Sequence, residues 1–252
     1  MADMAATPVD MIAVTGDLTN MGLPGECRNA LRWLERMPAP CTVIPGNHDT
    51  LVHADWQQTV GLWQPWMGAL PFPFVRRVGS VALIGVSSAV PTPWFRATGT
   101  LGVRQAARLR TLLHETGRQG LCRIVMIHHP PVAGLAVARK ALRDPDNFAA
   151  CIAHEGAEMV LHGHIHTSSI SSLPGPQGAV PVLGIASASA RSADPLRAAG
   201  WNRITVHRGD TGYALGVTRR CFPDGGQAVT SQETVFTPLS PSRSFPGISI
   251  SS

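Results

Sequence analysis

Four groups of Asp, Asn and His residues each follow a short apolar run in this 252-residue chain. The groups are Gly16-Asp17, Gly46-Asn47-His48-Asp49, His128-His129 and Gly163-His164-Ile165-His166. Carboxylate, amide and imidazole ligands suit Mn²⁺, Fe or Zn²⁺ rather than copper(I). Glycine lets the backbone turn tightly, so that the next side chain points into a shared pocket. If the apolar runs are adjacent parallel strands, the four groups meet at one edge of a sheet and can form a metal centre.

The apolar runs have the length and composition of buried strands. We expect such strands before the polar groups, at residues 11–14, 41–44, 124–127 and 159–161. Apolar residues on one helical face predict helices at 25–37 and 104–113, the Trp-rich residues 56–67 are also expected to be helical, and a further helix is expected at 147–154. Further strands are expected at 74–78, 81–86, 170–173, 180–185, 204–206 and 213–218. This order predicts an α/β layered sandwich with a mixed sheet.

The composition narrows the class of protein. Lys140 is the sole lysine and the arginines are spread along the chain, so the net charge of +5 does not indicate nucleic-acid binding. Five widely spaced cysteines without a Cys-x-x-Cys pair argue against a disulfide framework and a thiolate zinc site. No apolar stretch approaches the ~20 residues of a membrane span, and no secretory signal is evident, so we expect a cytoplasmic protein. The Ser- and Pro-rich residues 223–252 are expected to be a mobile tail after a domain at 1–222.

The order and spacing of the polar groups resemble the calcineurin-like metallophosphoesterases. The pattern of that family is Asp-x-His, Gly-Asp, Gly-Asn-His-Asp/Glu, a lone His and Gly-His-x-His. The resemblance covers residues 9–208, and its specific part is Gly-Asn-His-Asp followed by Gly-His-Ile-His. The His-His-Pro-Pro segment at 128–131 is most similar to the bacterial branch that contains class III cyclic nucleotide phosphodiesterases. The resemblance implies a four-layer α/β/β/α sandwich with mixed sheets.

The resemblance also implies roles for individual residues around two divalent transition metal ions, Mn, Fe or Zn. Asp17 would bridge the two metals, one of which would be completed by Asn47, His128 and His164. His166 would bind the other metal, and His48 would stand beside the leaving group as general acid or electrostatic stabiliser. The residues expected to support these ligands without binding metal are Gly16, Gly46, Asp49, His129 and Gly163. A hydroxide between the metals would attack a small phosphoester, by preference a phosphodiester.

One motif of the pattern is missing. Sixteen residues precede Asp17 and none of them is His. Asp10 lies seven residues upstream, about 23 Å away in an extended strand at about 3.3 Å per residue. Asp3 lies in a short segment that we expect to be mobile. We therefore expect the second metal to bind weakly, so that this chain holds one metal or two, and we expect the sandwich to lack its first strand.

Two explanations of the missing motif stay open, and three functions compete. Met1 is either an internal start in a longer natural protein, which we favour, or the start of a natural truncation with an impaired site. The first function is metal-dependent phosphoester hydrolysis. The others are a non-catalytic remnant that binds a metal or a phosphorylated ligand, and a basic nucleic-acid-associated module. Substrate and metal identity stay open, and a homodimer is one arrangement that the sequence allows.

Overall fold

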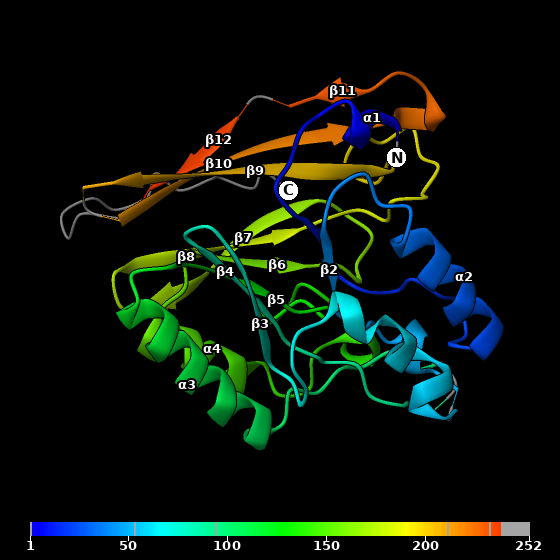
Figure 1. Ribbon diagram of the computed structural model, residues 1–252, viewed down its shortest axis with the longest axis horizontal. Coiled ribbons are helices and arrows are strands. Elements are labelled where there is room, and N and C mark those ends of the chain that lie inside the picture. The colour runs from blue at the N-terminus through cyan, green and yellow to red at the C-terminus, as the bar shows by residue number, and fades with distance from the viewer. Residues whose placement is uncertain (1, 53, 94, 211, 232, 238–252) are drawn as a thin grey trace.

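The computed structural model describes residues 2–52, 54–93, 95–210, 212–231 and 233–237 (Figure 1). Its largest sheet has six strands in the order β3-β4-β5-β6-β8-β7. These strands are β3 (Phe74–Val78), β4 (Val81–Gly85), β5 (Cys122–Met126), β6 (Met159–His162), β7 (Ser169–Gly175) and β8 (Gly178–Gly184). The four central strands are parallel, and the two edge strands, β3 and β7, are antiparallel to their neighbours. The sheet is therefore mixed, as the sequence predicts.

Two helices cover one face of this sheet, α3 (Val103–Arg118) and α4 (Pro145–Glu155) (Figure 1). Side chains alternate along a strand, so Val125 of β5 faces these helices while Ile124 and Met126 face the opposite way. The buried faces of the helices supply Leu109 and Leu113 from α3 and Phe148 and Ile152 from α4. The Asp144 carboxylate accepts the backbone N–H groups of Leu101 and Gly102 at 2.8 Å, which joins the starts of the two helices.

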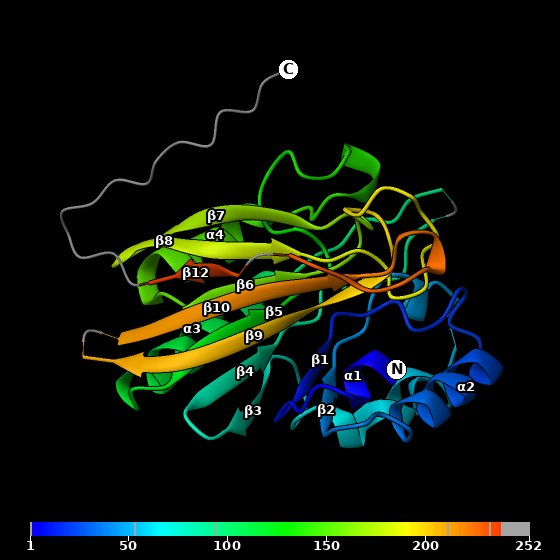
Figure 2. The ribbon, with the colours of Figure 1, turned by 90° about the horizontal axis from the view of Figure 1, so that it is seen from above.

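A second strand layer lies on the other face of the large sheet (Figures 1 and 2). It contains the parallel pair β1 (Ile12–Val14) and β2 (Cys41–Val43), and the antiparallel strands β9 (Gly200–Gly209), β10 (Gly212–Cys221), β11 (Val229–Thr230) and β12 (Thr234–Phe236). Leu215 and Val217 of β10 pack in one buried cluster with Ile124 and Met126 of β5. The short helix α1 (Ala2–Ala5) and helix α2 (Pro24–Leu34) flank this layer, so helices lie outside both strand layers. The α/β/β/α order is confirmed.

The segment expected as a helix at 56–67 folds differently. It forms two 3₁₀ helices, η2 (Trp56–Gln58) and η3 (Val60–Trp66). Pro65 lies inside η3, where its ring disfavours a continuous α-helix. Gly61 packs against Trp56 so closely that a Cβ atom would lie 2.5 Å from the Trp56 carbonyl oxygen. The other 3₁₀ helices are η1 (His48–Thr50), η4 (Ala138–Lys140) and η5 (Pro223–Gly225).

The expected mobile tail begins with residues that are held on a sheet. β11 and β12 both pair antiparallel with β10, and Phe236 packs against the buried cluster between the strand layers. Valine, threonine and phenylalanine favour strands, and β10 offers them an edge, which explains the pairing. Residues 229–230 and 234–236 are thus paired with a sheet, 238–252 lie outside the described residues, and the mobile tail stays a prediction. The domain boundary after residue 222 stays a prediction.

Two expectations drawn from the composition concern the cysteines and membrane-spanning helices. All five cysteines are buried free thiols, which confirms that the chain has no disulfide framework. Among the described residues, no helix has the length and apolarity to cross a membrane.

Candidate metal centre

Three of the predicted ligands come together at the ends of the parallel strands. Asp17 follows β1, His128 follows β5 and His164 follows β6. One side-chain ligand atom from each of them lies within 4.8 Å of the other two. The side chains of His128 and His164 are almost fully buried, so water competes little for their nitrogen atoms.

The hydrogen bonds of His128 determine which nitrogen faces this cluster. Its Nδ1 lies 2.7 Å from the carbonyl oxygen of Thr15, which can only accept, so Nδ1 carries the hydrogen. In the neutral ring the lone pair is therefore on Nε2. That atom lies 3.2 Å from Oδ2 of Asp17 and 3.2 Å from Oδ1 of Asn47. Three lone-pair atoms thus face one another, an arrangement that needs a proton or a cation between them.

The pKa shifts of Asp17 and His128 also indicate a proton or a cation between the two side chains. Burial raises the pKa of Asp17, but the charge and hydrogen bond of His128 lower it far below its ordinary value. Burial lowers the pKa of His128, but Asp17 overrides this effect and raises it above the ordinary value. Without a metal the pair therefore keeps a proton between Nε2 and the carboxylate. A divalent cation in the same place would satisfy all three atoms, so the donor set fits a transition metal.

His164 is oriented in the same manner as His128, with the nitrogens exchanged. Its Nε2–H donates to the carbonyl oxygen of Lys140 at 2.8 Å, which leaves the lone pair on Nδ1. The residue has a φ of +68°, in the left-handed region, directly after Gly163. Burial first, and then the charge of His128, lower the pKa of His164 to about 3. The ring is thus neutral at ordinary pH, which is the form that binds metal.

Asp49 holds the loops that carry Asp17 and Asn47. Its buried carboxylate accepts the N–H groups of Asp17 at 2.9 Å, Gly46 at 2.8 Å and Thr19 at 2.9 Å, and it also accepts the Thr19 hydroxyl. Two glycines allow the close approach of these loops. A Cβ atom on Gly46 would lie 2.1 Å from Oδ1 of Asp17, and one on Gly16 would lie 2.6 Å from the Gly46 nitrogen.

The comparison with known families decides the identity. The model of the family described as calcineurin-like phosphoesterase matches residues 2–168, which include every predicted ligand. The chain belongs to the calcineurin-like phosphoesterase family. This confirms the resemblance that the sequence motifs indicate.

Two curated relatives of this phosphoesterase are cyanobacterial. A probable cyclic nucleotide phosphodiesterase of Synechococcus sp. is 27% identical over 201 residues, which are 78% of this chain and 72% of the relative. A 3',5'-cyclic-nucleotide phosphodiesterase of Nostoc sp. is 23% identical over 165 residues, which are 63% of this chain and 56% of the relative. Both names agree with the bacterial branch indicated by the His-His-Pro-Pro segment.

Two solved structures share the fold. A dimetal phosphatase from Danio rerio has a TM-score of 0.56 at 10% identity, with 94% of this chain and 87% of that chain covered. A protein from Thermus thermophilus has a TM-score of 0.52 at 14% identity, with 79% of this chain and 84% of that chain covered. At these identities the likeness concerns the fold alone.

Of the two remaining predicted histidines, His48 contacts the cluster through Asp17 and His166 lies outside the group of close ligands. The His48 N–H donates to Oδ1 of Asp17 at 3.0 Å, and its ring Nδ1 lies 2.7 Å from the carbonyl oxygen of Asn20. With the hydrogen on Nδ1, the lone pair of the neutral His48 ring is on Nε2. His166 is exposed, has a φ of +51° and is not part of the group of three mutually close ligands.

The two aspartates near the N-terminus do not join this centre. The Asp3 carboxylate accepts the indole N–H of Trp201 at 2.8 Å and is paired with Arg220. Asp10 is exposed. Within the described ranges, the group of close ligands contains no carboxylate besides that of Asp17. Neither aspartate therefore takes the place of the missing Asp-x-His motif.

His129 is fully buried, and both of its ring nitrogens have hydrogen-bond partners outside the ligand cluster. Its Nδ1 lies 2.7 Å from the Ser88 hydroxyl and its Nε2 lies 3.2 Å from the carbonyl oxygen of Ala97. Burial and the charges of His128 and His164 lower the pKa of His129 to about 2, so the ring is neutral. Its ring centroid is only 4.4 Å from that of His164.

Sequence reasoning missed the groups that orient the imidazoles. These are the carbonyl oxygens of Thr15, Asn20, Lys140 and Ala97 and the hydroxyl of Ser88. Every residue carries a carbonyl, so no residue type could have marked the first four. Ser88 lies two residues after the strand predicted at 81–86, and nothing in the neighbouring sequence pairs it with His129.

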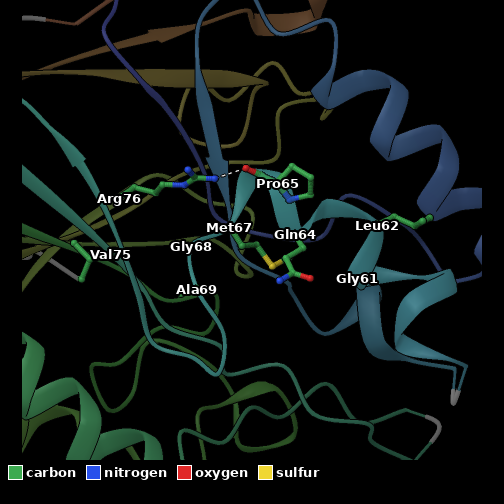
Figure 3. Close-up of a pocket in the computed structure, with 9 residues that line it drawn as sticks. All are labelled: Gly61, Leu62, Gln64, Pro65, Met67, Gly68, Ala69, Val75 and Arg76. Carbon is green, nitrogen blue, oxygen red and sulfur yellow. Dashed lines mark hydrogen bonds between the residues drawn. The ribbon is translucent and has the colours of Figure 1, made fainter.

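Two hollows lie outside the ligand cluster. One of about 730 Å³ is lined by residues of η3 and β3, where the Arg76 guanidinium donates to the Pro65 carbonyl oxygen (Figure 3). It contains none of the predicted site residues, so it adds nothing to the chemistry of the centre. A smaller one of about 300 Å³ adjoins the loop that orients His48, and its lining includes Asn20, Glu26 and Trp33.

Proposed function

We propose that this chain hydrolyses a phosphodiester with a divalent transition metal held by Asp17, His128 and His164, with Asn47 as a fourth ligand. The observation that carries the proposal is the convergence of ligand atoms from Asp17, His128 and His164, with both imidazole rings held by hydrogen bonds to backbone carbonyl oxygens. Such outward hydrogen bonds fix the tautomer and orientation of metal-binding imidazoles. When bound, the metal would supply positive charge to the phosphoryl oxygens and a water acidic enough to attack near neutral pH.

His48 is the proposed general acid. Its Nδ1–H bond to the Asn20 carbonyl aims Nε2 away from the loop, and its backbone N–H is bonded to Asp17. In the doubly protonated ring Nε2–H can donate to the leaving oxygen. The proton passes to that oxygen as the bond from phosphorus to oxygen breaks, which avoids release of a free alkoxide.

Asp17 and the residues beneath it position the reacting groups. Its carboxylate is held by the His48 N–H, while Asp49 holds the Asp17 backbone. Gly16, Gly46 and Gly163 permit the turns between strand and ligand, and His129 supports the wall beside His164. We propose His166 as a ligand of a second metal. We expect this metal to bind more weakly than the first, because Asp17 is the only carboxylate of the close group within the described residues. Mn²⁺, Fe and Zn²⁺ are the metals that these ligands favour.

The names of the two cyanobacterial relatives make a cyclic nucleotide a candidate substrate within the proposed class. A cytoplasmic location and a homodimer remain predictions from the sequence. A second function is supported by the incomplete ligand set for two metals. In that case the chain binds one metal and a phosphorylated ligand without turnover.

The test is hydrolysis of bis(p-nitrophenyl) phosphate by the Mn²⁺-loaded chain. We expect release of p-nitrophenol that stops on chelation and falls at least about 100-fold in His128→Ala. His154→Ala is the matched control, because His154 is exposed on α4, away from the ligand groups. Phosphate binding without turnover would favour the second function. Absence of metal binding, phosphate binding and turnover would contradict both.

A further inference from the structure

Two loops beside the candidate metal centre are hydrogen-bonded to each other. The N–H of Ala97 donates to the Arg139 carbonyl at 2.9 Å, that of Gly99 to the Ala141 carbonyl at 3.2 Å, and that of Arg143 to the Gly99 carbonyl at 2.9 Å. We call residues 97–101 and 139–144 the paired loops. Asp144 closes their far end by accepting the N–H groups of Leu101 and Gly102. The paired loops therefore form one unit rather than two independent segments.

Two histidines attach the paired loops to the centre. His164, a candidate metal ligand, donates to the Lys140 carbonyl at 2.8 Å. His129 donates through Nε2 to the Ala97 carbonyl at 3.2 Å, while its Nδ1 accepts the Ser88 hydroxyl at 2.7 Å. The packing around His129 is tight, because a Cβ atom on Gly99 would lie 2.3 Å from its Nδ1. The position of the loops relative to the centre is thus set at two points.

This arrangement places Lys140 next to the centre in the chain trace, because its carbonyl oxygen accepts the Nε2–H of His164 at 2.8 Å. It is the sole lysine of the chain, its side chain is exposed, and it makes no ion pair among the described residues. Burial lowers the pKa of His164 and of His166 most; the charge of His128 then lowers that of His164, and the Lys140 charge has a smaller lowering effect on both.

An unpaired lysine next to a divalent metal site is electrostatically unfavourable by itself. Like charges repel, and the repulsion is relieved when an anion lies between them. Clefts lined by positive charge also concentrate anionic substrates. We propose that Lys140 is a specificity-determining residue that binds an anionic oxygen of the substrate, and that His129 is the positioning residue that holds Lys140 there through the paired loops. This inference rests on the proposed function.

The anionic oxygen has two sources, the phosphate that is cleaved or a further phosphate on the substrate. A matched pair of substrates separates them: thymidine 5'-(p-nitrophenyl phosphate) and the same compound with a 3'-phosphate. We expect Lys140→Met to raise KM about tenfold for at least one of the two, with kcat and bound metal changed less than about twofold. Lys140→Arg should retain a low KM, and Arg36→Met, which removes an exposed positive charge after α2, should match the wild type.

The identity of the affected substrate assigns the source. A rise in KM for both compounds identifies the reacting phosphate, and a rise for the 3'-phosphorylated compound alone identifies the further phosphate. An unchanged KM for both overturns the assignment of Lys140.

The role of His129 is tested with two substitutions that differ in side-chain length. In His129→Gln the amide nitrogen can still reach the Ala97 carbonyl, whereas in the shorter His129→Asn it cannot. We expect His129→Asn to raise KM for the same substrate as Lys140→Met does. In the double variant KM should be no higher than in Lys140→Met alone, because the effects of residues that act as one unit do not add. His129→Gln should restore much of the wild-type value. Loss of metal from His129→Asn, or an additive effect on KM, would overturn the positioning role.

A binding measurement tests the role of Lys140 independently of whether the chain hydrolyses a substrate. Calorimetric titration of the metal-loaded chain with thymidine 5'-monophosphate and thymidine 3',5'-bisphosphate needs no turnover. Failure of the wild type to hydrolyse either ester would contradict the proposed function alone. An affinity for both nucleotides that is the same in wild type and Lys140→Met would contradict the role of Lys140 whether or not the chain is active.

Discussion

The Nδ1 atom of His128 lies 2.7 Å from the carbonyl oxygen of Thr15, the residue that follows β1. This bond connects the end of β5 to the end of β1, in the two strand layers. Its chemical consequence is that the His128 lone pair is on Nε2, opposite the Asp17 carboxylate. The Thr15 carbonyl in one layer thus orients the His128 ring of the other layer so that its Nε2 lone pair can bind a cation.

Metal stoichiometry follows from this geometry. We expect one tightly held equivalent of Mn²⁺ or Zn²⁺ after loading and desalting, because Asp17, His128 and His164 form one close group. A second equivalent should be lost on desalting, since only Asp17 and His166 are available to it among the predicted ligands. Elemental analysis measures both. Two equivalents that survive desalting would mean that a group outside the predicted set completes the second site.

Metal binding should compete with a proton on His128. The Asp17 carboxylate raises the pKa of His128 above its ordinary 6.5 in the metal-free chain. Metal affinity should therefore fall as the pH falls below this raised pKa, and binding near neutral pH should release a proton. Calorimetry in buffers of different ionisation enthalpy measures the released proton. Proton release that is equal in wild type and His128→Ala would contradict this assignment.

The same pair makes the stability of the metal-free chain depend on pH. A group whose pKa is raised on folding stabilises the folded state below its unfolded pKa, and this contribution is lost as the pH rises through the folded pKa. For His128 the loss begins above about pH 6.5. We expect the free energy of unfolding of the metal-free chain to fall across this range, and added metal to reverse the fall. Urea denaturation with and without Zn²⁺ measures both effects.

Asp49 should matter for stability more than for ligand chemistry. Its two oxygen atoms accept three backbone N–H groups and one hydroxyl. Asparagine offers only one oxygen, so Asp49→Asn leaves buried donors facing an NH₂ group. We expect a loss of about 2–4 kcal/mol in the free energy of unfolding. The exposed Asp10→Asn is the control, and an equal, small loss in both variants would contradict the role of Asp49.

Much of the fold and of the ligand cluster follows from the sequence for a simple reason. A short apolar run indicates a buried strand, and the glycine in Gly16-Asp17 and Gly163-His164 indicates a turn after it, whereas His128 follows its predicted strand without a glycine. The apolar runs before Asp17, His128 and His164 therefore predict both the strands and the edge at which their ligands meet. Helix α3 is predicted because its apolar residues lie on one face, and the helix expected at 147–154 corresponds to α4.

Features that depend on tertiary pairing escape this kind of prediction. β11 and β12 are short and lie in Ser- and Pro-rich sequence, and only the open edge of β10 makes them strands. The paired loops contain no periodic pattern, since their hydrogen bonds join backbone groups that every residue possesses. For that reason Lys140 is visible in the sequence as an isolated lysine, while its place beside His164 is visible only in the structure.

The tightest steric constraint in the centre is at Gly46. A Cβ atom there would lie 2.1 Å from Oδ1 of Asp17, and 2.6 Å from the Asp17 backbone nitrogen. Gly46→Ala must therefore displace Asp17 from the cluster, and we expect metal affinity to fall about 10–100-fold, as for other residues that orient ligands. Gly25→Ala is the matched control, because a Cβ atom on Gly25 in α2 meets nothing within 4 Å. Competition with a chromogenic chelator measures the affinity, and a folded Gly46→Ala variant with wild-type affinity would show that Asp17 is not a ligand in this position.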